Sequence, residues 1–274
     1  MPSTHTLDVP GARLYYEERG SGPLLLLIGS PMDSTGFAAF AEALADEFEV
    51  VTYDPRGLGH STREDTDTDL TPEQQAEDVC RLIGALDAGP AYVFGSSGGA
   101  VVGLAAVTAH ADHVRTLVAH EPPVVTLLPD RDAALAHFGE VYDTFRTGGV
   151  GPAMQKFMTV TGLGPPGPDD TATAPAPAPE EAARMATTAE TFLGHMLRPT
   201  THYEPDIAAL SAAPTRIIVA AGATSQGQVA NRTALALADA LGSDIVEFPG
   251  DHTGFIAFPG ECAQVLQGLL GETT

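Results

Sequence analysis

The sequence has 274 residues, which is enough for one large α/β domain with a full hydrophobic core. Its net charge of −23 argues against nucleic acid or an anionic membrane as a partner, because a polyanion would be repelled along most of the surface. The start of the chain lacks the pattern of a signal peptide, and the longest apolar run, LLLLI at 24–28, is too short to span a bilayer, so we expect a soluble, cytoplasmic protein.

Short apolar segments alternate with alanine-rich segments of helical period, which predicts a mostly parallel sheet with helices on both faces. The expected strands lie at residues 13–19, 24–28, 50–53, 92–94, 116–119, 216–220 and 245–248. The expected helices lie at residues 38–47, 72–86, 98–109, 229–241 and 260–270. Thr71 followed by Pro72 is a typical helix start, because the hydroxyl can cap the first turn and proline suits the first helical position.

The alternation is interrupted by a long insertion, in which two helical segments (132–145 and 180–197) flank a tract rich in proline and alanine. Such a tract cannot build a core of its own, so we expect an exposed, mobile loop at about residues 162–182. The insertion resembles a helical cap over one end of the sheet. The predicted organisation is a core at residues 1–121 and 214–274 and a cap at residues 122–213.

The segment GSSGG at residues 95–99 follows a predicted strand, precedes a predicted helix and fits the pattern G-x-S-x-G. Ser97 would occupy a tight strand-to-helix turn, where Gly95 and Gly99 have no side chains to collide as the strand and the helix approach each other. The alternative is a plain turn whose hydroxyls cap the helix. The context favours Ser97 as a nucleophile and leaves Ser96 without a catalytic role.

A serine nucleophile needs a general base, and His252 is well placed for that role. It lies in the segment FPGDHTGF directly after the last predicted strand, at the sheet edge that also presents Ser97. Other histidines are placed less well: His5 lies before the core, His60 in an earlier loop and His195 in the insertion. We therefore predict His252 as the base.

An oxyanion formed at the substrate carbonyl needs N–H donors that are already oriented. The backbone N–H of Gly98, the residue after the nucleophile, is one candidate, helped by the helix N-terminus. The backbone N–H of Ser30, in the segment IGSP after strand 24–28, is the other, since Pro31 has no N–H. A simple turn is the alternative reading of IGSP.

Three segments together resemble the α/β-hydrolase family: GSSGG, GDHTGF and YDPRGLGHS at residues 53–61. The third is similar to the family's D-x-R-G-x-G-x-S segment, which shapes a loop and is not usually catalytic. The resemblance extends from one end of the chain to the other. It implies an α/β-hydrolase fold and a serine hydrolase without a cofactor.

The chain departs from this family at the acid of the catalytic triad. Most members carry an aspartate after the strand that corresponds to 216–220, and here Ser225 stands at that place. No carboxylate occurs between Asp206 and Asp239. Glu121 ends the preceding strand, where a minority of members keep their acid, and we predict that it completes the triad. The alternative is a surface carboxylate before a Pro-Pro turn.

The arrangement around Glu121 is similar to haloalkane dehalogenases and to fungal zearalenone lactone hydrolases. Dehalogenases need an aspartate nucleophile, whereas position 97 is serine, so the lactone hydrolases are the better parallel. Apolar cap side chains allow a bulky apolar ligand, although such residues more often form the core of a cap. They are Phe138, Phe145, Met154, Phe157, Met158, Phe192 and Met196.

The predicted function is hydrolysis of an apolar carboxylic ester or lactone by Ser97, Glu121 and His252. Two alternatives stay open: a catalytically idle ligand-binding protein of the same fold, and a lyase or perhydrolase that uses the same triad. Cys80 and Cys262 lack the spacing of a metal site, so we expect buried free thiols and no bound metal or cofactor. A homodimer is the assembly that we consider for this protein, with a small apolar ester or lactone as its substrate.

Overall fold

The computed structural model describes residues 2–164 and 178–271. Its centre is a nine-stranded sheet with the order β1-β2-β4-β3-β6-β7-β8-β9, in which β5 pairs with β2. All pairs from β4 to β9 along this order are parallel, and β2 pairs antiparallel with β1, β4 and β5. The strands are β1 Ser3–Val9, β2 Ala12–Gly20, β3 Leu24–Ser30, β4 Glu49–Tyr53, β5 Thr62–Arg63, β6 Ala91–Ser97, β7 Val114–His120, β8 Arg216–Gly222 and β9 Ile245–Phe248.

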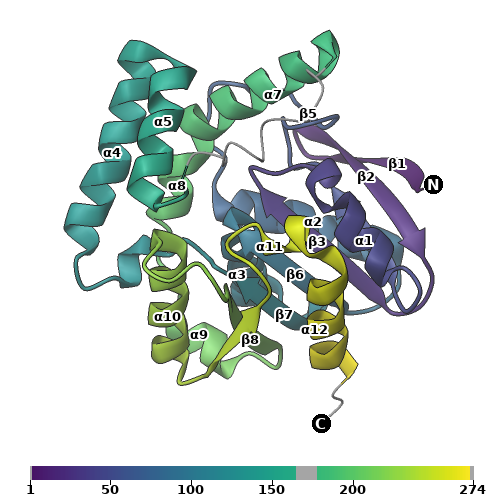
Figure 1. The fold of residues 1–274 in the computed structure, drawn as a ribbon. Helices are drawn as coiled ribbons and strands as arrows, with labels where there is room; N and C mark the ends of the chain where they lie inside the picture. Colours follow the sequence, from purple (N-terminus) through teal and green to yellow (C-terminus); the bar gives the residue numbers. More distant parts are fainter. Residues whose placement is uncertain (1, 165–177, 272–274) are drawn as a thin grey trace.

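Helices cover both faces of this sheet, as the sequence predicts. Figure 1 shows α1 and α12 in front of the sheet and α2 and α3 behind it. Strand β3 is buried throughout because its alternate residues enter the two layers, with Leu26 packing toward α2 and α3 and Leu27 toward α1 and α12. The helices of these layers are α1 Ala38–Leu44, α2 Pro72–Leu86, α3 Gly98–His110, α9 Ile207–Ala212, α10 Val229–Leu241, α11 Gly254–Ala257 and α12 Pro259–Gly271.

The start of α2 agrees with its sequence signal. The Thr71 hydroxyl accepts a hydrogen bond of 3.2 Å from the backbone N–H of Gln74, and Pro72 occupies the first turn. In the ranges 2–164 and 178–271, no helix is long and apolar enough to cross a membrane.

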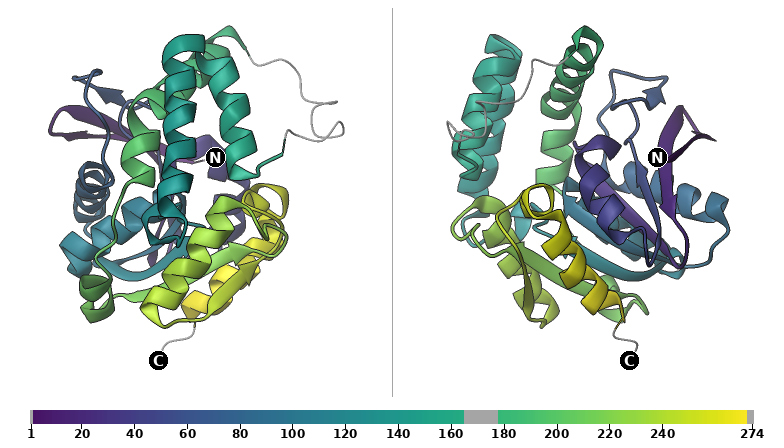
Figure 2. Two further views of the ribbon diagram at one scale, coloured as in Figure 1. Left: turned by 90° about the vertical axis from the view of Figure 1, so that its left-hand side faces the viewer. Right: turned by 45° about the vertical axis from the view of Figure 1, so that its right-hand side comes forward.

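The chain between β7 and β8 forms a group of helices at one end of the sheet, as Figures 1 and 2 show. Their shared apolar cluster includes Phe138 and Leu193 and also takes in Leu58 from the loop between β4 and β5. α9 also belongs to this stretch, but its Leu210 packs in the cluster with α2 and α3. The helices at the sheet end are α4 Arg131–Gly148, α5 Val150–Thr161, α7 Pro179–Thr191, a π-helical turn Phe192–Met196 and α8 Leu197–Thr201.

The predicted mobile loop at about 162–182 falls mostly on residues 165–177, which lie outside the described residues. The end of the predicted loop is helical, because α7 begins at Pro179. Several other elements were not expected from the sequence, namely β1, β5, α5, α9 and α11, and the helix expected at 180–197 continues through α8 to Thr201. The division of the chain into a core and a cap as separate units stays a prediction.

Candidate active site

Ser97 lies at the junction between β6 and α3, in a backbone conformation that non-glycine residues rarely adopt. Its φ is 56° and its ψ is −126°. A Cβ at Gly99 would lie 2.1 Å from the carbonyl oxygen of Ile28, so β3 and α3 approach too closely for any side chain at this position. The Ser97 side chain makes no capping hydrogen bond to α3. The absence of this bond speaks against a helix-capping role, and the dihedral angles agree with the tight strand-to-helix turn predicted for Ser97.

We predict that Gly99→Ala lowers the free energy of unfolding by at least about 2 kcal/mol, because the added methyl group would overlap the backbone of β3. The matched control is Gly139→Ala within α4, where an added Cβ would meet no atom within 4 Å. That change should stabilise the protein by about 0.5–1 kcal/mol. Urea unfolding followed by circular dichroism measures both changes. An unfolding free energy of Gly99→Ala equal to that of the wild type would contradict this account of the elbow.

Glu121 and His252 form a buried pair at the carboxyl edge of the sheet. The distance between Glu121 Oε2 and His252 Nδ1 is 2.6 Å, and the Glu121 side chain is 0% exposed. Glu121 directly follows β7 and has a φ of 49°, so like Ser97 it lies in the left-handed region. Strained backbone of this kind persists where the surrounding structure enforces it and is frequent at functional sites.

The second oxygen of the Glu121 carboxylate is held by the loop after β8. Oε1 accepts a hydrogen bond of 3.0 Å from the backbone N–H of Gly222 and another from the Ser225 hydroxyl. Asn231 Nδ2 in turn donates to Ser225 Oγ at 3.3 Å. The residue at the family's usual aspartate position therefore contacts the Glu121 carboxylate directly.

These contacts decide the charge of Glu121. Burial raises the pKa of its carboxyl, but the hydrogen bond and charge of His252, with the hydrogen bond from Ser225, outweigh burial and hold the pKa below its usual value. The carboxylate is therefore ionised at neutral pH.

His120 is a neighbour of the site that sequence reasoning misses. Its Nδ1 lies 3.2 Å from the Ser96 hydroxyl, and its ring centroid lies 6.2 Å from that of His252. Burial lowers the pKa of His120 to about 4, so the ring is neutral at physiological pH. His120 pairs with Ser96 rather than with Ser97, which leaves His252 as the candidate base.

The two predicted oxyanion donors lie beside Ser97, Ser30 at the end of β3 and Gly98 at the start of α3. Ser30 is the last residue of β3 and pairs in register with Ser97 on β6. A Cβ at Gly98 would lie 2.6 Å from the carbonyl oxygen of Ser30, so the two backbones are in close contact. The Ser30 hydroxyl donates to Gln75 Oε1 at 3.3 Å. Both residues line the same cavity as Ser97.

The segment at residues 53–61 has a structural role. The Asp54 carboxylate is fully buried and accepts hydrogen bonds from the backbone N–H groups of Ser34 and His60. Arg56 forms a buried ion pair with Asp78 on α2, with 2.6 Å between Nε and Oδ2. These bonds fix the loop and lie outside the residues that line the cavity.

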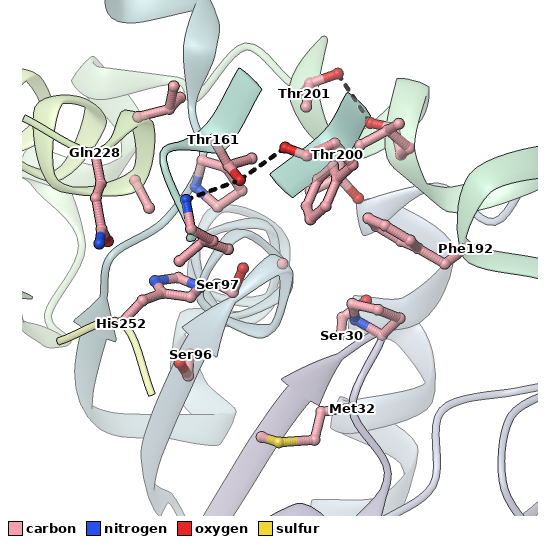
Figure 3. Close-up of a pocket in the computed structure, with 18 of the residues that line it drawn as sticks. Ser30, Met32, Ser96, Ser97, Thr161, Phe192, Thr200, Thr201, Gln228 and His252 are labelled. Carbon is pink, nitrogen blue, oxygen red and sulfur yellow. Dashed lines mark hydrogen bonds between the residues drawn. The ribbon is translucent and has the colours of Figure 1, made fainter. Parts of the chain in front are cut away.

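A cavity of about 240 Å³ lies between the sheet end and the helices from α4 to α8. Ser30, Ser97, Gly98 and His252 line it. Figure 3 shows Ser97 and His252 side by side on its wall. Of the cap residues considered from the sequence, Phe138, Met154, Phe157 and Phe192 line the cavity. No hydrogen bond joins Ser97 to His252 in the described part of the chain, and in unliganded enzymes such bonds often tighten only when substrate binds.

Neither cysteine lines the cavity. Cys80 and Cys262 are free and buried, and burial raises the pKa of their thiols to about 12 and about 11. No group of three or more histidine, cysteine, aspartate or glutamate side chains among the described residues is arranged to hold a metal ion.

Comparison with known proteins agrees with this architecture. The family model of the alpha/beta hydrolase fold matches residues 22–154. An uncharacterized hydrolase of Bacillus subtilis (strain 168), YraK, is 32% identical over 271 residues, which cover 97% of this chain and 95% of that protein. A zearalenone hydrolase of Bionectria ochroleuca is 30% identical over 132 residues, 46% of this chain and 50% of that protein.

Solved structures share the fold over the whole chain. The structure of a thermophilic esterase from Thermogutta terrifontis covers 99% of this chain and 98% of its own, with a TM-score of 0.73 and 22% identity. The match to YraK extends over nearly the full length of both proteins. The chain is therefore a hydrolase that belongs to the α/β-hydrolase fold family, as the motifs in its sequence predict.

Proposed function

We propose that the protein is a serine hydrolase that cleaves a carboxylic ester or lactone through an acyl-enzyme. Ser97 is the nucleophile, His252 the general base and Glu121 the acid of the triad. The observation that carries the proposal is the 2.6 Å contact between His252 and the buried Glu121, beside a serine in the elbow conformation. Nucleophile, base and acid in this relation form the constellation used for acyl transfer on several unrelated folds.

The proposed cycle begins when His252 Nε2 removes the proton from the Ser97 hydroxyl as its oxygen attacks the substrate carbonyl. The backbone N–H groups of Gly98 and Ser30 stabilise the resulting oxyanion. Collapse of the tetrahedral intermediate breaks the bond to the alkoxy oxygen, which leaves with the proton carried by His252. Water, activated by the same histidine, then hydrolyses the acyl-serine and regenerates Ser97.

Glu121 serves this cycle through His252. Its ionised carboxylate beside Nδ1 favours the tautomer that leaves Nε2 free to accept a proton, and it stabilises the imidazolium that forms. Glutamate has one methylene more than aspartate. The longer side chain helps the carboxylate to reach His252 from the end of β7, whereas the usual acid of the family follows β8. The buried bonds from Gly222 and Ser225 keep the carboxylate in place.

An ester or lactone is the substrate class that the cavity supports best. Its walls are mostly apolar, and aromatic and methionine side chains from α4 and α5 line it together with Ser97. The partial match to a protein named zearalenone hydrolase supports the same class. An aryl ester, an aliphatic ester or a macrolactone would each place a carbonyl at Ser97 and an apolar body in the cavity.

The experiment that tests this function is a turnover screen over aryl esters, aliphatic esters and macrolactones, with Ser97→Ala as the control. We expect hydrolysis of at least one class by the wild type and none above background by the control. Product analysis with and without peroxide separates hydrolysis from perhydrolysis. Absence of turnover on every class would favour the ligand-binding alternative and overturn the proposal.

Ser225→Ala is predicted to lower kcat about tenfold or less. The Glu121 carboxylate loses the hydroxyl bond but keeps its bonds to Gly222 and His252, and the loss of one of several donors has a modest cost. Steady-state kinetics on the best substrate measures the effect. A decrease as large as that of a Glu121 variant would show that Ser225 has a larger part in the triad than this geometry assigns.

A further inference from the structure

Most polar side chains on the cavity wall are already bonded within the protein. The hydroxyls of Thr161 and Thr201 each donate to a helix carbonyl at 2.8 Å, those of Phe157 and Leu197. The hydroxyls of Ser30 and Ser96 pair with Gln75 and His120, and that of Thr253 donates to Asp251. Each of these groups therefore already has a hydrogen-bond partner within the protein.

Gln228 differs from them. Its side-chain oxygen, Oε1, is buried and has no hydrogen-bond partner among the described residues. Gln228 lines the cavity together with Ser97 and His252, and in Figure 3 its amide group is directed toward the part of the cavity where His252 lies. Leaving a buried acceptor without a partner is costly, so Oε1 is a strong candidate to bind a donor brought by the substrate.

The surroundings hold Gln228 in this position. It precedes α10, where its backbone N–H donates to the carbonyl of Ser225 at 3.1 Å and its own carbonyl accepts from Arg232 at 3.0 Å. Its side-chain stem lies against Gly162 at the end of α5, where an added Cβ would be 3.5 Å from Gln228 Cγ. The side chain makes no capping hydrogen bond to α10, so its amide is not required by the helix.

The cavity also limits the charge of what it can bind. None of the described residues that line it is an aspartate, glutamate, lysine or arginine. A charged group would lose its hydration there without gaining an opposite charge, which is costly. The donor that fits Gln228 is therefore an uncharged one, and a hydroxyl group meets this requirement on a neutral ester or lactone.

We infer that Gln228 is a specificity-determining residue that selects uncharged esters or lactones carrying a hydroxyl group, which donates a hydrogen bond to Oε1. The inference rests on the proposed function, because it takes Ser97 as the site of cleavage. A site built to bond a substrate hydroxyl discriminates against the analogue without it, since the buried acceptor then stays unpaired.

The test compares kcat/KM for methyl phenylacetate and its 2-, 3- and 4-hydroxy analogues, so that the hydroxyl is offered at three positions. The measured quantity is kcat/KM for each hydroxy ester divided by kcat/KM for the parent ester. This ratio cancels effects that are common to both esters. We expect at least one ratio to fall about tenfold in Gln228→Leu. The matched control is Gln264→Leu, an exposed glutamine on α12, in which every ratio should stay within about twofold of the wild type.

Two further measurements keep the inference separate from the proposed function. Isothermal titration calorimetry measures the preference for hydroxy esters without turnover. The same esters are bound to Ser97→Ala and to the double variant Ser97→Ala with Gln228→Leu. We expect the preference in the first protein and its loss in the second. Gln228→Met, which keeps the length of the stem, replaces Gln228→Leu if that variant does not fold.

The outcomes distinguish the two claims. Unchanged ratios in the Gln228 variants, with turnover still abolished by Ser97→Ala, would overturn the inference and leave the proposed function standing. Equal binding of hydroxy and parent esters to Ser97→Ala would also overturn it. Turnover that survives Ser97→Ala would instead refute the proposed function, whatever the ratios show.

Discussion

Ser97→Ala is expected to lower kcat on a cleaved ester by at least about three orders of magnitude while the protein stays folded. The reason for the loss is that alanine has no oxygen to form the acyl-enzyme. The fold should survive because the Ser97 side chain makes no capping hydrogen bond and faces the cavity. Steady-state kinetics and thermal unfolding of the purified variant measure the two effects.

Ser96→Ala is the matched control for that change, since the two serines are adjacent in the elbow. The Ser96 hydroxyl is buried against His120 and should have a far smaller effect on kcat. Substantial turnover by Ser97→Ala, or an equal loss in both variants, would remove the basis for assigning Ser97 as the nucleophile.

Glu121→Gln is expected to lower kcat by about two to four orders of magnitude without unfolding the protein. Glutamine keeps the shape of the side chain but has no negative charge to stabilise the imidazolium of His252. Its amide can also present a donor to Nδ1, which favours the wrong tautomer. The comparison of kcat with the wild type on one substrate, with circular dichroism as a check of the fold, measures the effect.

The control for this substitution is Glu247→Gln on the exposed side of β9, which should leave kcat nearly unchanged. Near-full activity of Glu121→Gln on a substrate that Ser97→Ala does not cleave would show that Glu121 is not the acid of the triad. Asp130 and Asp132 are then the residues to examine. Asp130 already pairs with Arg232 at 2.6 Å, and Asp132 is exposed, so both fit the role less well than Glu121.

The sheet strands that pack on both sides are the part of the fold that the sequence predicts well. Residues 24–28 of β3 form a continuous apolar run in the sequence because helices cover both faces of the strand. β1 has no such pattern, since most of its side chains are exposed and the strand is held by backbone pairing with β2. α5 is hidden from a pattern search by Gly151 and Pro152, which are typical helix breakers but here lie in the first turn.

The candidate site also has a part that the sequence predicts and a part that depends on tertiary packing. Ser97 and His252 follow strands in recognisable local motifs, and Glu121 can be proposed because no acid occurs at position 225. The contact between Ser225 and Glu121 depends on how the loop after β8 folds against β7, which no local pattern encodes. The same holds for Gln228, whose place in the cavity depends on α10 packing against α5.

Labelling with a fluorophosphonate tests the central claim most directly, because the reagent phosphonylates a serine only where a base and an oxyanion site activate it. Trypsin should release residues 82–115 as one peptide, and fragmentation of that peptide distinguishes Ser97 from Ser96. The account predicts one phosphonyl group on Ser97, none in Ser97→Ala, and labelling slowed by about two orders of magnitude or more in Glu121→Gln. An unlabelled wild-type protein, or a label on any residue other than Ser97, would contradict it.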